Sequence, residues 1–406
     1  MSTTTGVWVV GARGGVATCM LAGLAGIRRD LCGREGLVTE RPAFSGMGLI
    51  PLDGLVFGGH EIRKTTLRTA AAEVRARAGT LSPELLEAVG EDLDEIDARV
   101  RPGTARGCGK AITGLDGVSG LLEKKYKPAK ILDHLTADMS EFASETGVDR
   151  LVVINVSSTE PFRAELPGFC SDLAGFEKAV AKGEDGVRAG MLYSCAAFRA
   201  GAAYVNFTPT VASEIGALRE MAEKAGLPHC GKDGKTGETL MKTALAPMFV
   251  ERNFRVLSWE GYNIFGNRDA VVLDDPQNNL AKTRGKDAAL RDILGDDRTH
   301  TRVRIDYCPS LDDWKTAWDF IHFKGFAGTR MILQFIWQGC DSMLAAPLAL
   351  DLARLTDNAM RRGEKGVMEH VSAFFKQPSD GDHRDFFAQS LKLMEYVASR
   401  SQAKLA

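Results

Sequence analysis

The sequence lacks the features that would place the chain in a membrane or an oxidising compartment. No apolar run approaches the roughly 20 residues that a helix needs to cross a bilayer. The first residues show no secretory signal pattern. The eight cysteines contain no C-x-x-C pair. We therefore expect a cytoplasmic enzyme with reduced thiols and no membrane partner.

Two further absences narrow the classes of function. The net charge is −2, so the chain has no general basic field, and we expect no nucleic-acid partner. The seven histidines show no H-x-x-H or H-E-x-x-H spacing, so we predict no histidine-built metal site. The sequence does not decide whether carboxylates and a phosphate hold a monovalent or divalent cation.

The chain does carry a strand, a glycine turn and a helix at its start, in "GVWVVGARGGVATCMLAGLAGI" (6–27). The turn is a possible pyrophosphate site, because helix N–H groups are free there. The spacing of Gly11, Gly14 and Gly15 departs from G-x-G-x-x-G, and the turn alone fits a plain strand–helix connection equally well. Glu61 ends the next strand candidate, where a dinucleotide fold has its ribose-binding acid.

Strands and helices alternate through the first half of the chain. Apolar runs at 150–162 and 201–210 end in short polar loops, and helical segments separate them. This pattern predicts a Rossmann-like doubly wound parallel sheet. After about residue 245 the strand-like segments follow one another without long helices between them, which predicts an α+β second domain with a mostly antiparallel sheet. We divide the chain into a dinucleotide-binding domain (1–245), a catalytic and oligomerisation domain (246–340) and C-terminal helices returning to the first domain (341–406).

The stretch "HCGKDGKTGET" (229–239) is rich in glycine, lysine and threonine. It fails the P-loop pattern G-x-x-x-x-G-K-[ST] in both frames, because one frame ends in Asp233 and the other begins at His229. A solvated turn and a phosphate site of another kind both remain possible.

Several lysines stand in turns or at helical spacing. Lys282 and Lys286 are four residues apart, Lys315 follows two aspartates, and Lys376 ends "SAFFK". Lysines at this helical spacing repel each other by a few tenths of a kcal/mol, and a shared anion would reverse that effect. A solvated basic face is the plain alternative. A buried mixed-charge site is plausible as well, because neighbouring loop-like motifs carry Asp233, Asp269, Asp313 and Asp341.

Long segments of the chain resemble the inositol-3-phosphate synthase family, also called myo-inositol-1-phosphate synthases, and more closely its archaeal-type members. The segments are "VFGGHEI", "INVSSTEPF", "CGKDGKTGETLMKTALAPMF", "GYNIFGNRDAVVL" and "GCDSMLAAPLALDL". The resemblance covers nearly the whole chain. It implies a redox-neutral isomerase that converts glucose 6-phosphate to 1D-myo-inositol 3-phosphate, with NAD recycled in each turnover and a homotetrameric assembly.

The resemblance also implies the site residues. The expected catalytic residues are Asp233, Lys282, Lys286, Lys315, Asp341 and Lys376. The expected phosphate ligands are Lys235, Thr236, Gly237 and Lys286. The expected NAD-binding residues are Gly11, Ala12, Arg13, Gly14, Gly15, Val16, Ala17, Thr18, Glu61, Ser157, Thr159 and Asp269. Fixed ammonium groups would stabilise the oxyanions formed at each step. Lysines that cluster also lower one another's pKa, so that one of them could act as acid or base.

The chain departs from the family pattern next to these positions. "GNRDA" (266–270) stands where G-N-N-D-G is common, so Arg268 replaces a smaller residue. Two other activities therefore stay open. The same chemistry on fructose 6-phosphate would give a five-membered cyclitol phosphate, and a simple NAD-dependent dehydrogenase would accumulate NADH.

Overall fold

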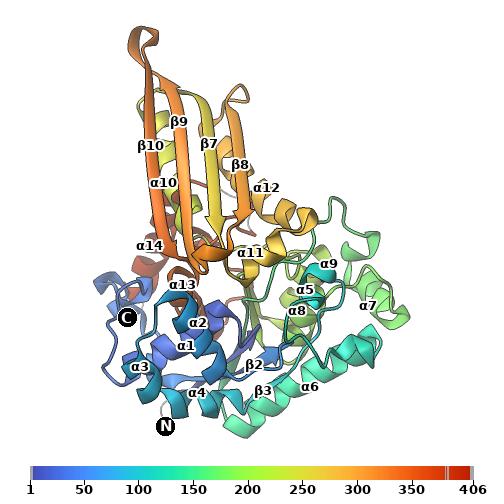
Figure 1. Cartoon of the computed structure of the whole chain (residues 1–406). Coiled ribbons are helices and arrows are strands. Elements are labelled where there is room, and N and C mark those ends of the chain that lie inside the picture. Colours follow the sequence, from blue (N-terminus) through green and yellow to red (C-terminus); the bar gives the residue numbers. More distant parts are fainter. Residues whose placement is uncertain (1–2, 380, 382–383, 403–406) are drawn as a thin grey trace.

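A seven-stranded sheet forms the larger part of the molecule (Figure 1). Its strands are β1 (Thr5–Val10), β2 (Leu55–Glu61), β3 (Val100–Pro102), β4 (Arg150–Asn155), β5 (Ala203–Asn206), β6 (Pro228–Gly231) and β11 (Gly366–Val367). The order is β11-β6-β5-β4-β1-β2-β3, and all neighbours are parallel, which confirms the predicted doubly wound sheet. The computed structural model describes residues 3–379, 381 and 384–402, without the side chains of 284–289 and 402.

Helices cover both faces of this sheet. One face packs on α1 (Gly15–Arg28), α2 (Leu67–Ala78), α4 (Gly90–Asp97), α13 (Asp341–Arg361) and α14 (Phe386–Gln402). The other face packs on α6 (Pro128–Thr146), α7 (Leu173–Lys182), α8 (Ala189–Arg199) and α9 (Gly216–Ala225). The short helices α3 (Pro83–Ala88) and α5 (Lys110–Thr113) lie in connections. Because both faces are covered, β1 is buried at every position, which explains its unbroken apolar sequence.

A second sheet of four strands projects from this body (Figure 1). Its order is β10 (Arg330–Cys340), β9 (Trp314–Lys324), β7 (Arg255–Phe265) and β8 (His300–Tyr307). Two of its three pairings are antiparallel, which confirms the mostly antiparallel prediction, whereas β7 and β8 are parallel. The expectation of no long helix between these strands was wrong. A parallel pair needs a crossover, and α11 (Arg268–Leu273) and α12 (Pro276–Leu294) provide it.

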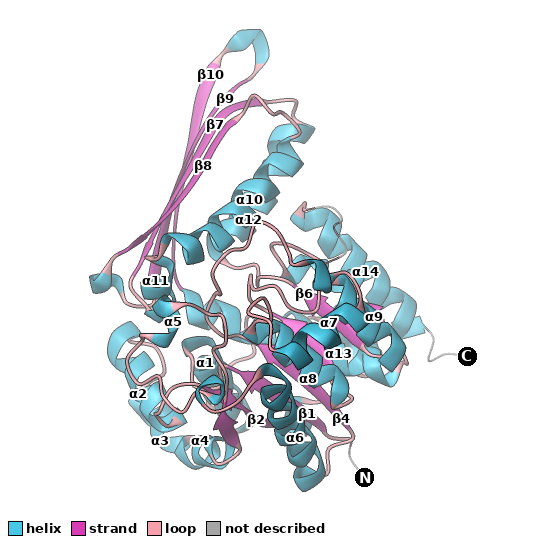
Figure 2. Cartoon of the chain, turned by 90° about the vertical axis from the view of Figure 1, so that its right-hand side faces the viewer, coloured by secondary structure: helices cyan, strands magenta, loops and turns pink. Residues whose placement is uncertain are grey.

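One face of the second sheet is covered and the other is open. Figure 2 shows α10 (Gly237–Glu251) and α12 along one side of the sheet. Phe249 and Leu290 of these helices pack there on Trp259 and Ile321.

The division of the chain at residues 245 and 340 stays a prediction. Within the described residues, no helix has both the length and the apolar composition to cross a membrane.

A buried charge cluster joins α10 to the second sheet. The ammonium of Lys242, 2% exposed, lies 2.7 Å from Glu238 and 3.4 Å from Asp319 of β9. Asp319 also accepts a hydrogen bond from the indole of Trp259 at 2.7 Å. Burial raises the pKa of Asp319 to about 7, against the lowering effect of Lys242. The cluster fixes α10, whose first turn reaches the candidate site described below.

Replacing Lys242 by alanine should therefore destabilise the protein by about 3–5 kcal/mol, because buried carboxylates lose their counter-ion. Lys224→Ala is the matched control, since Lys224 makes the same i,i+4 contact with Glu220 but is 66% exposed. That change should cost only about 0.5 kcal/mol. Denaturant unfolding of the two variants measures both values, and equal losses would contradict this view of the cluster.

Candidate active site

The glycine turn after β1 allows an unusually close approach to the backbone. Gly11 has φ +86°, and a Cβ there would lie 3.0 Å from the Cα of Ser157. A Cβ on Gly15 would lie 2.7 Å from the hydroxyl oxygen of Ser342. Side chains at these positions would therefore clash or be strained. The turn exposes the start of α1, where no side chain caps the free amides.

Residues around this turn fit a dinucleotide. The hydroxyl of Thr18 is buried and has no hydrogen-bond partner among the described residues, and it lines the same cavity as the turn. The carboxylate of Glu61 accepts backbone N–H groups of Arg13 at 2.7 Å, Ile62 at 2.7 Å and Arg63 at 3.0 Å. A carboxylate has room for about four hydrogen bonds, so Glu61 can still accept a ribose hydroxyl. The glycine turn, the free amides at the start of α1 and the carboxylate of Glu61 are together the features of a dinucleotide-binding fold.

Most of the residues predicted to bind NAD line this one cavity. They are Gly11, Arg13, Gly14, Gly15, Val16, Thr18, Glu61, Ser157, Thr159 and Asp269. The structure corrects the prediction for Ala12 and Ala17, because their side chains are buried in the apolar core and do not line the cavity. Ala17 lies within α1, on the side of the helix that packs on the sheet.

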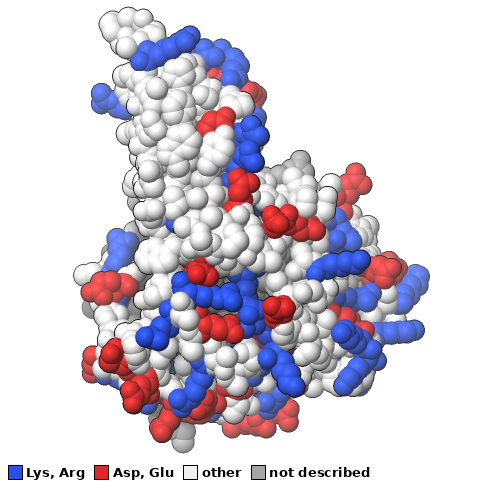
Figure 3. All heavy atoms as spheres, in the orientation of Figure 1, with Lys and Arg blue, Asp and Glu red and all other residues white. Residues whose placement is uncertain are grey.

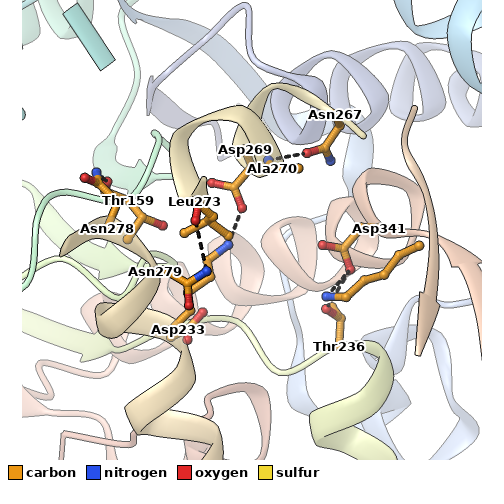
Figure 4. A network of polar contacts seen from close by, with 12 residues as sticks. Thr159, Asp233, Thr236, Asn267, Asp269, Ala270, Leu273, Asn278, Asn279 and Asp341 are labelled. Atoms are coloured by element: carbon orange, nitrogen blue, oxygen red, sulfur yellow. Dashed lines mark hydrogen bonds and ion pairs between the residues drawn. The ribbon is translucent and has the colours of Figure 1, made fainter. Parts of the chain in front are cut away.

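Three lysine–aspartate pairs lie at this cavity. Figure 4 shows their aspartates, Asp233, Asp269 and Asp341. Lys282 of α12 pairs with Asp269 of α11. Lys376 pairs with Asp233 at 2.9 Å, and Lys315 of β9 lies 3.7 Å from Asp341 at the start of α13. Asp233, Asp269, Asp341, Lys282 and Lys376 line the cavity. Five segments that are distant in sequence therefore contribute to one site.

Lys376 reaches the site because two loops pair like strands. The backbone N–H of Lys376 donates to Asp233 O at 2.7 Å, and that of Lys235 donates to Phe374 O at 2.8 Å. A Cβ on Gly234 would lie 2.1 Å from the ring of Phe207, so glycine there leaves room for this ring beside the loop. This pairing sets Lys376 beside Asp233.

The predicted phosphate ligands divide into two groups. Thr236 lines the cavity, and its hydroxyl lies 3.5 Å from Asp341. Gly237, with φ +51°, begins α10. The structure corrects the prediction that Lys235 binds the phosphate, since its ammonium points away from the cavity to Gln389 of α14. Successive side chains of an extended segment point to opposite sides, so Thr236 and Lys235 cannot both face the cavity. The side chain of Lys286 lies outside the described residues.

Asp313 is a buried residue of the site that was expected in a mixed-charge group with other aspartates but not among the catalytic residues. It accepts hydrogen bonds from Asn267 Nδ2 at 2.5 Å and from the backbone N–H and hydroxyl of Ser342, both at 3.1 Å. Burial raises the pKa of Asp313. Asn267 also caps α11 by accepting the N–H of Ala270. Asp313 thereby ties the start of α11, which carries Asp269, to the start of α13. Its sequence signals were its place beside Lys315 and its place among the loop aspartates near the lysines.

The electrostatics of Lys282 differ from the expectation that clustered lysines lower one another's pKa. Burial lowers the pKa of Lys282, but the charges of Asp269 and Asp233 and the hydrogen bond to Asp269 outweigh burial, so the net pKa is raised. Lys282 therefore stays protonated at neutral pH and can act as a fixed positive charge. The described residues include no group of three His, Cys, Asp or Glu side chains placed to hold a metal ion.

Comparison with known proteins agrees with this geometry. The sequence profile described as "Myo-inositol-1-phosphate synthase", an NAD-binding family, matches residues 5–397. The chain belongs to this family. It is 33% identical to "Inositol-3-phosphate synthase 1" of Bacteroides thetaiotaomicron, over 95% of this chain and 92% of that protein. It is therefore an isomerase-type enzyme of an NAD-binding family.

Two solved structures show the same fold as this family member. The crystal structure of inositol-3-phosphate synthase from Caenorhabditis elegans aligns with a TM-score of 0.89 at 22% identity, covering 99% of this chain and 86% of that one. A myo-inositol-1-phosphate synthase-related protein from Thermotoga maritima aligns with a TM-score of 0.79 at 24% identity, covering 97% and 98%.

The buried Lys235 predicts a pH effect on stability. Burial lowers its pKa to about 7, so between pH 7 and 10 the unfolded chain binds a proton that the folded chain does not. The free energy of unfolding contributed by this residue should therefore rise with pH across that window. Relative to Lys235→Met, the wild type should gain stability from pH 7 to pH 9 in urea unfolding. The exposed Lys130→Met is the control, and a pH-independent difference for Lys235→Met would contradict the assignment.

Proposed function

We propose that the protein converts glucose 6-phosphate to 1D-myo-inositol 3-phosphate without net redox change. NAD, when bound, supplies the reversible acceptance of a hydride. The observation that supports this proposal most is one cavity that holds both the glycine turn and the lysine–aspartate pairs. A hydride acceptor beside fixed ammonium groups suits oxidation, enolisation and aldol closure within one sugar phosphate.

Each lysine has a proposed role set by its position. Lys282 stays charged next to Asp269, so it would donate a hydrogen bond to the C5 oxygen as that oxygen gains negative charge. Lys315, beside Asp341, would stabilise the oxyanions that develop next, and Lys376 would polarise the C1 carbonyl. Thr236 and Gly237 would hold the phosphate at the start of α10, and the family resemblance assigns Lys286 to the same phosphate.

Asp233 is the group we place against the substrate hydroxyls. One of its oxygens accepts the Lys376 ammonium, and the other is buried with no hydrogen-bond partner among the described residues. A buried carboxylate oxygen without a donor is costly unless a ligand supplies one. Asp233, Asp269 and Asp341 each already face a lysine. A cation would therefore bind mainly through the substrate phosphate.

All eight cysteines are free, which supports a reducing, cytoplasmic setting.

Incubation with NAD and each sugar phosphate tests the reaction. Glucose 6-phosphate should give inositol phosphate, while absorbance from NADH stays flat because the hydride is returned. Fructose 6-phosphate should give no ring-closed product. A five-membered cyclitol phosphate from fructose 6-phosphate alone, or a steady rise of NADH, would replace this proposal with one of its two alternatives.

Replacing Lys376 by methionine tests the role of the paired lysines. Turnover should fall by about 100-fold or more, because removing one preorganised donor typically costs that much. NAD affinity should change little, since the glycine turn is untouched. Lys365→Met is a control on a nearby surface, where Lys365 is 59% exposed. Retained turnover in Lys376→Met would rule out the assigned role.

We further propose that the protein is a homotetramer assembled through the second sheet. On the open face, Ile336 is 67% exposed, Ile332 57% and Trp318 37%, and Ile336 and Trp318 are cross-strand neighbours. Figure 3 shows this part of the projecting sheet as a largely uncharged surface. Its edge strand β10 also carries unpaired backbone groups. An apolar sheet face with a free edge suits a second copy of the same chain.

Ile336→Glu should lower the oligomeric state, because it places a charge on the proposed interface. Sedimentation velocity should show a tetramer for the wild type and smaller species for the variant. Leu391→Glu, at a 60% exposed leucine on α14, is the control. A wild-type monomer would contradict the proposal.

A further inference from the structure

An arginine at the start of α11 reaches across the mouth of the cavity. Arg268 stands where the family pattern has a smaller residue. Its Nη1 donates to the backbone oxygen of Asp116 at 3.1 Å, and its Nη2 lies 3.5 Å from Glu73 Oε2 on α2. Arg268 therefore connects α11, which carries Asp269, to α2 of the body.

A second arginine meets the same carboxylate from the other side. Arg63 Nη2 donates to Glu73 at 2.9 and 3.2 Å, and its Nη1 donates to the backbone oxygen of Arg13 at 3.2 Å. Because Arg13 belongs to the glycine turn, the Arg63 guanidinium lies directly beside that turn. Arg63, Glu73 and Arg268 all line the cavity.

This cluster has more positive than negative charge. Two guanidinium groups share the single carboxylate of Glu73, and Arg77 lines the same wall. Burial lowers the pKa of Arg268, and the charge of Arg63 lowers it further. Asp97 does not offset this excess, because it is paired with another arginine, Arg13, at 2.6 Å. Figure 3 shows basic side chains gathered at the hollow between the projecting sheet and the body.

We propose that Arg63 and Arg268 form a clamp on the diphosphate of the bound dinucleotide, and that Glu73 holds both guanidinium groups in place. The free amides of α1 would bind the diphosphate from the turn, and the two arginines would bind its remaining oxygens. The clamp would also hold α11, and with it Asp269, against the cofactor. This inference rests on the NAD-binding part of the proposed function and is independent of which sugar is the substrate.

The alternative ligand for these arginines is a phosphate on the adenosine ribose, as in NADP. The position of Glu61 disfavours this, because its carboxylate ends β2 where the ribose hydroxyl would lie. The diphosphate is therefore the anion that fits the cluster, and the test below separates the two.

Calorimetric titration of the purified protein tests the clamp directly. The ligands are NAD, ADP-ribose, adenosine and NADP, and the variants are Arg268→Met and Arg63→Met. Each variant should bind NAD and ADP-ribose about 10- to 100-fold more weakly, because each loses a charge-assisted contact. Adenosine affinity should stay within about two-fold, since adenosine has no phosphate.

Arg75→Met is the matched control, because Arg75 lies on α2, is exposed and does not line the cavity. It should bind all four ligands like the wild type. Thermal unfolding checks that each variant folds, and Arg63→Met tests the clamp from the body side if Arg268→Met does not fold. Unchanged NAD affinity, an equal loss for adenosine, or a loss confined to NADP would overturn the proposal. Absence of inositol phosphate formation would leave these titrations unaffected.

Discussion

The site depends on the pairing of buried lysine ammonium groups with aspartate carboxylates. Charges this deep in a protein are tolerated only when they are paired and hydrogen-bonded. Lys376 and Asp233 are 9% and 4% exposed, and Lys282 and Asp269 are 17% and 26% exposed. The carboxylates around Lys282 outweigh the lowering effect of burial on its pKa and keep it charged before any ligand arrives. Such preorganised charge stabilises a developing oxyanion without reorganisation during the reaction.

This pairing is possible because the two sheets meet at one cavity. The body contributes the glycine turn and the loop that carries Asp233, and the second sheet contributes the crossover with Asp269 and Lys282. Lys315 of β9 adjoins the cavity through its contact with Asp341. Two buried networks hold the junction: Asp313 binds the starts of α11 and α13, and the Lys242 cluster holds α10 on β9. The parallel pairing of β7 and β8 matters for the proposed site, because its crossover helices carry one of the three lysine–aspartate pairs.

Much of this arrangement could be predicted from the sequence, and the failures have physical causes. Apolar runs such as the one ending at Val10 predict buried parallel strands, because no other element of that length buries both faces. The orientation of Lys235 could not be predicted, because it depends on pairing with Phe374, a contact between residues far apart in the chain. The hydrogen bonds of Asp313 could not be predicted for the same reason, since its partners Asn267 and Ser342 come from other segments. The α12 crossover was missed because its sequence is polar.

The central claim is that hydride leaves and returns within one closed site. The most direct measurement follows glucose 6-phosphate that carries deuterium at C5. The account predicts inositol phosphate that keeps the deuterium on the carbon derived from C5, with no labelled reduced cofactor released to solution. Inositol phosphate that has lost the deuterium, or labelled reduced cofactor that accumulates as the sugar is consumed, would contradict it.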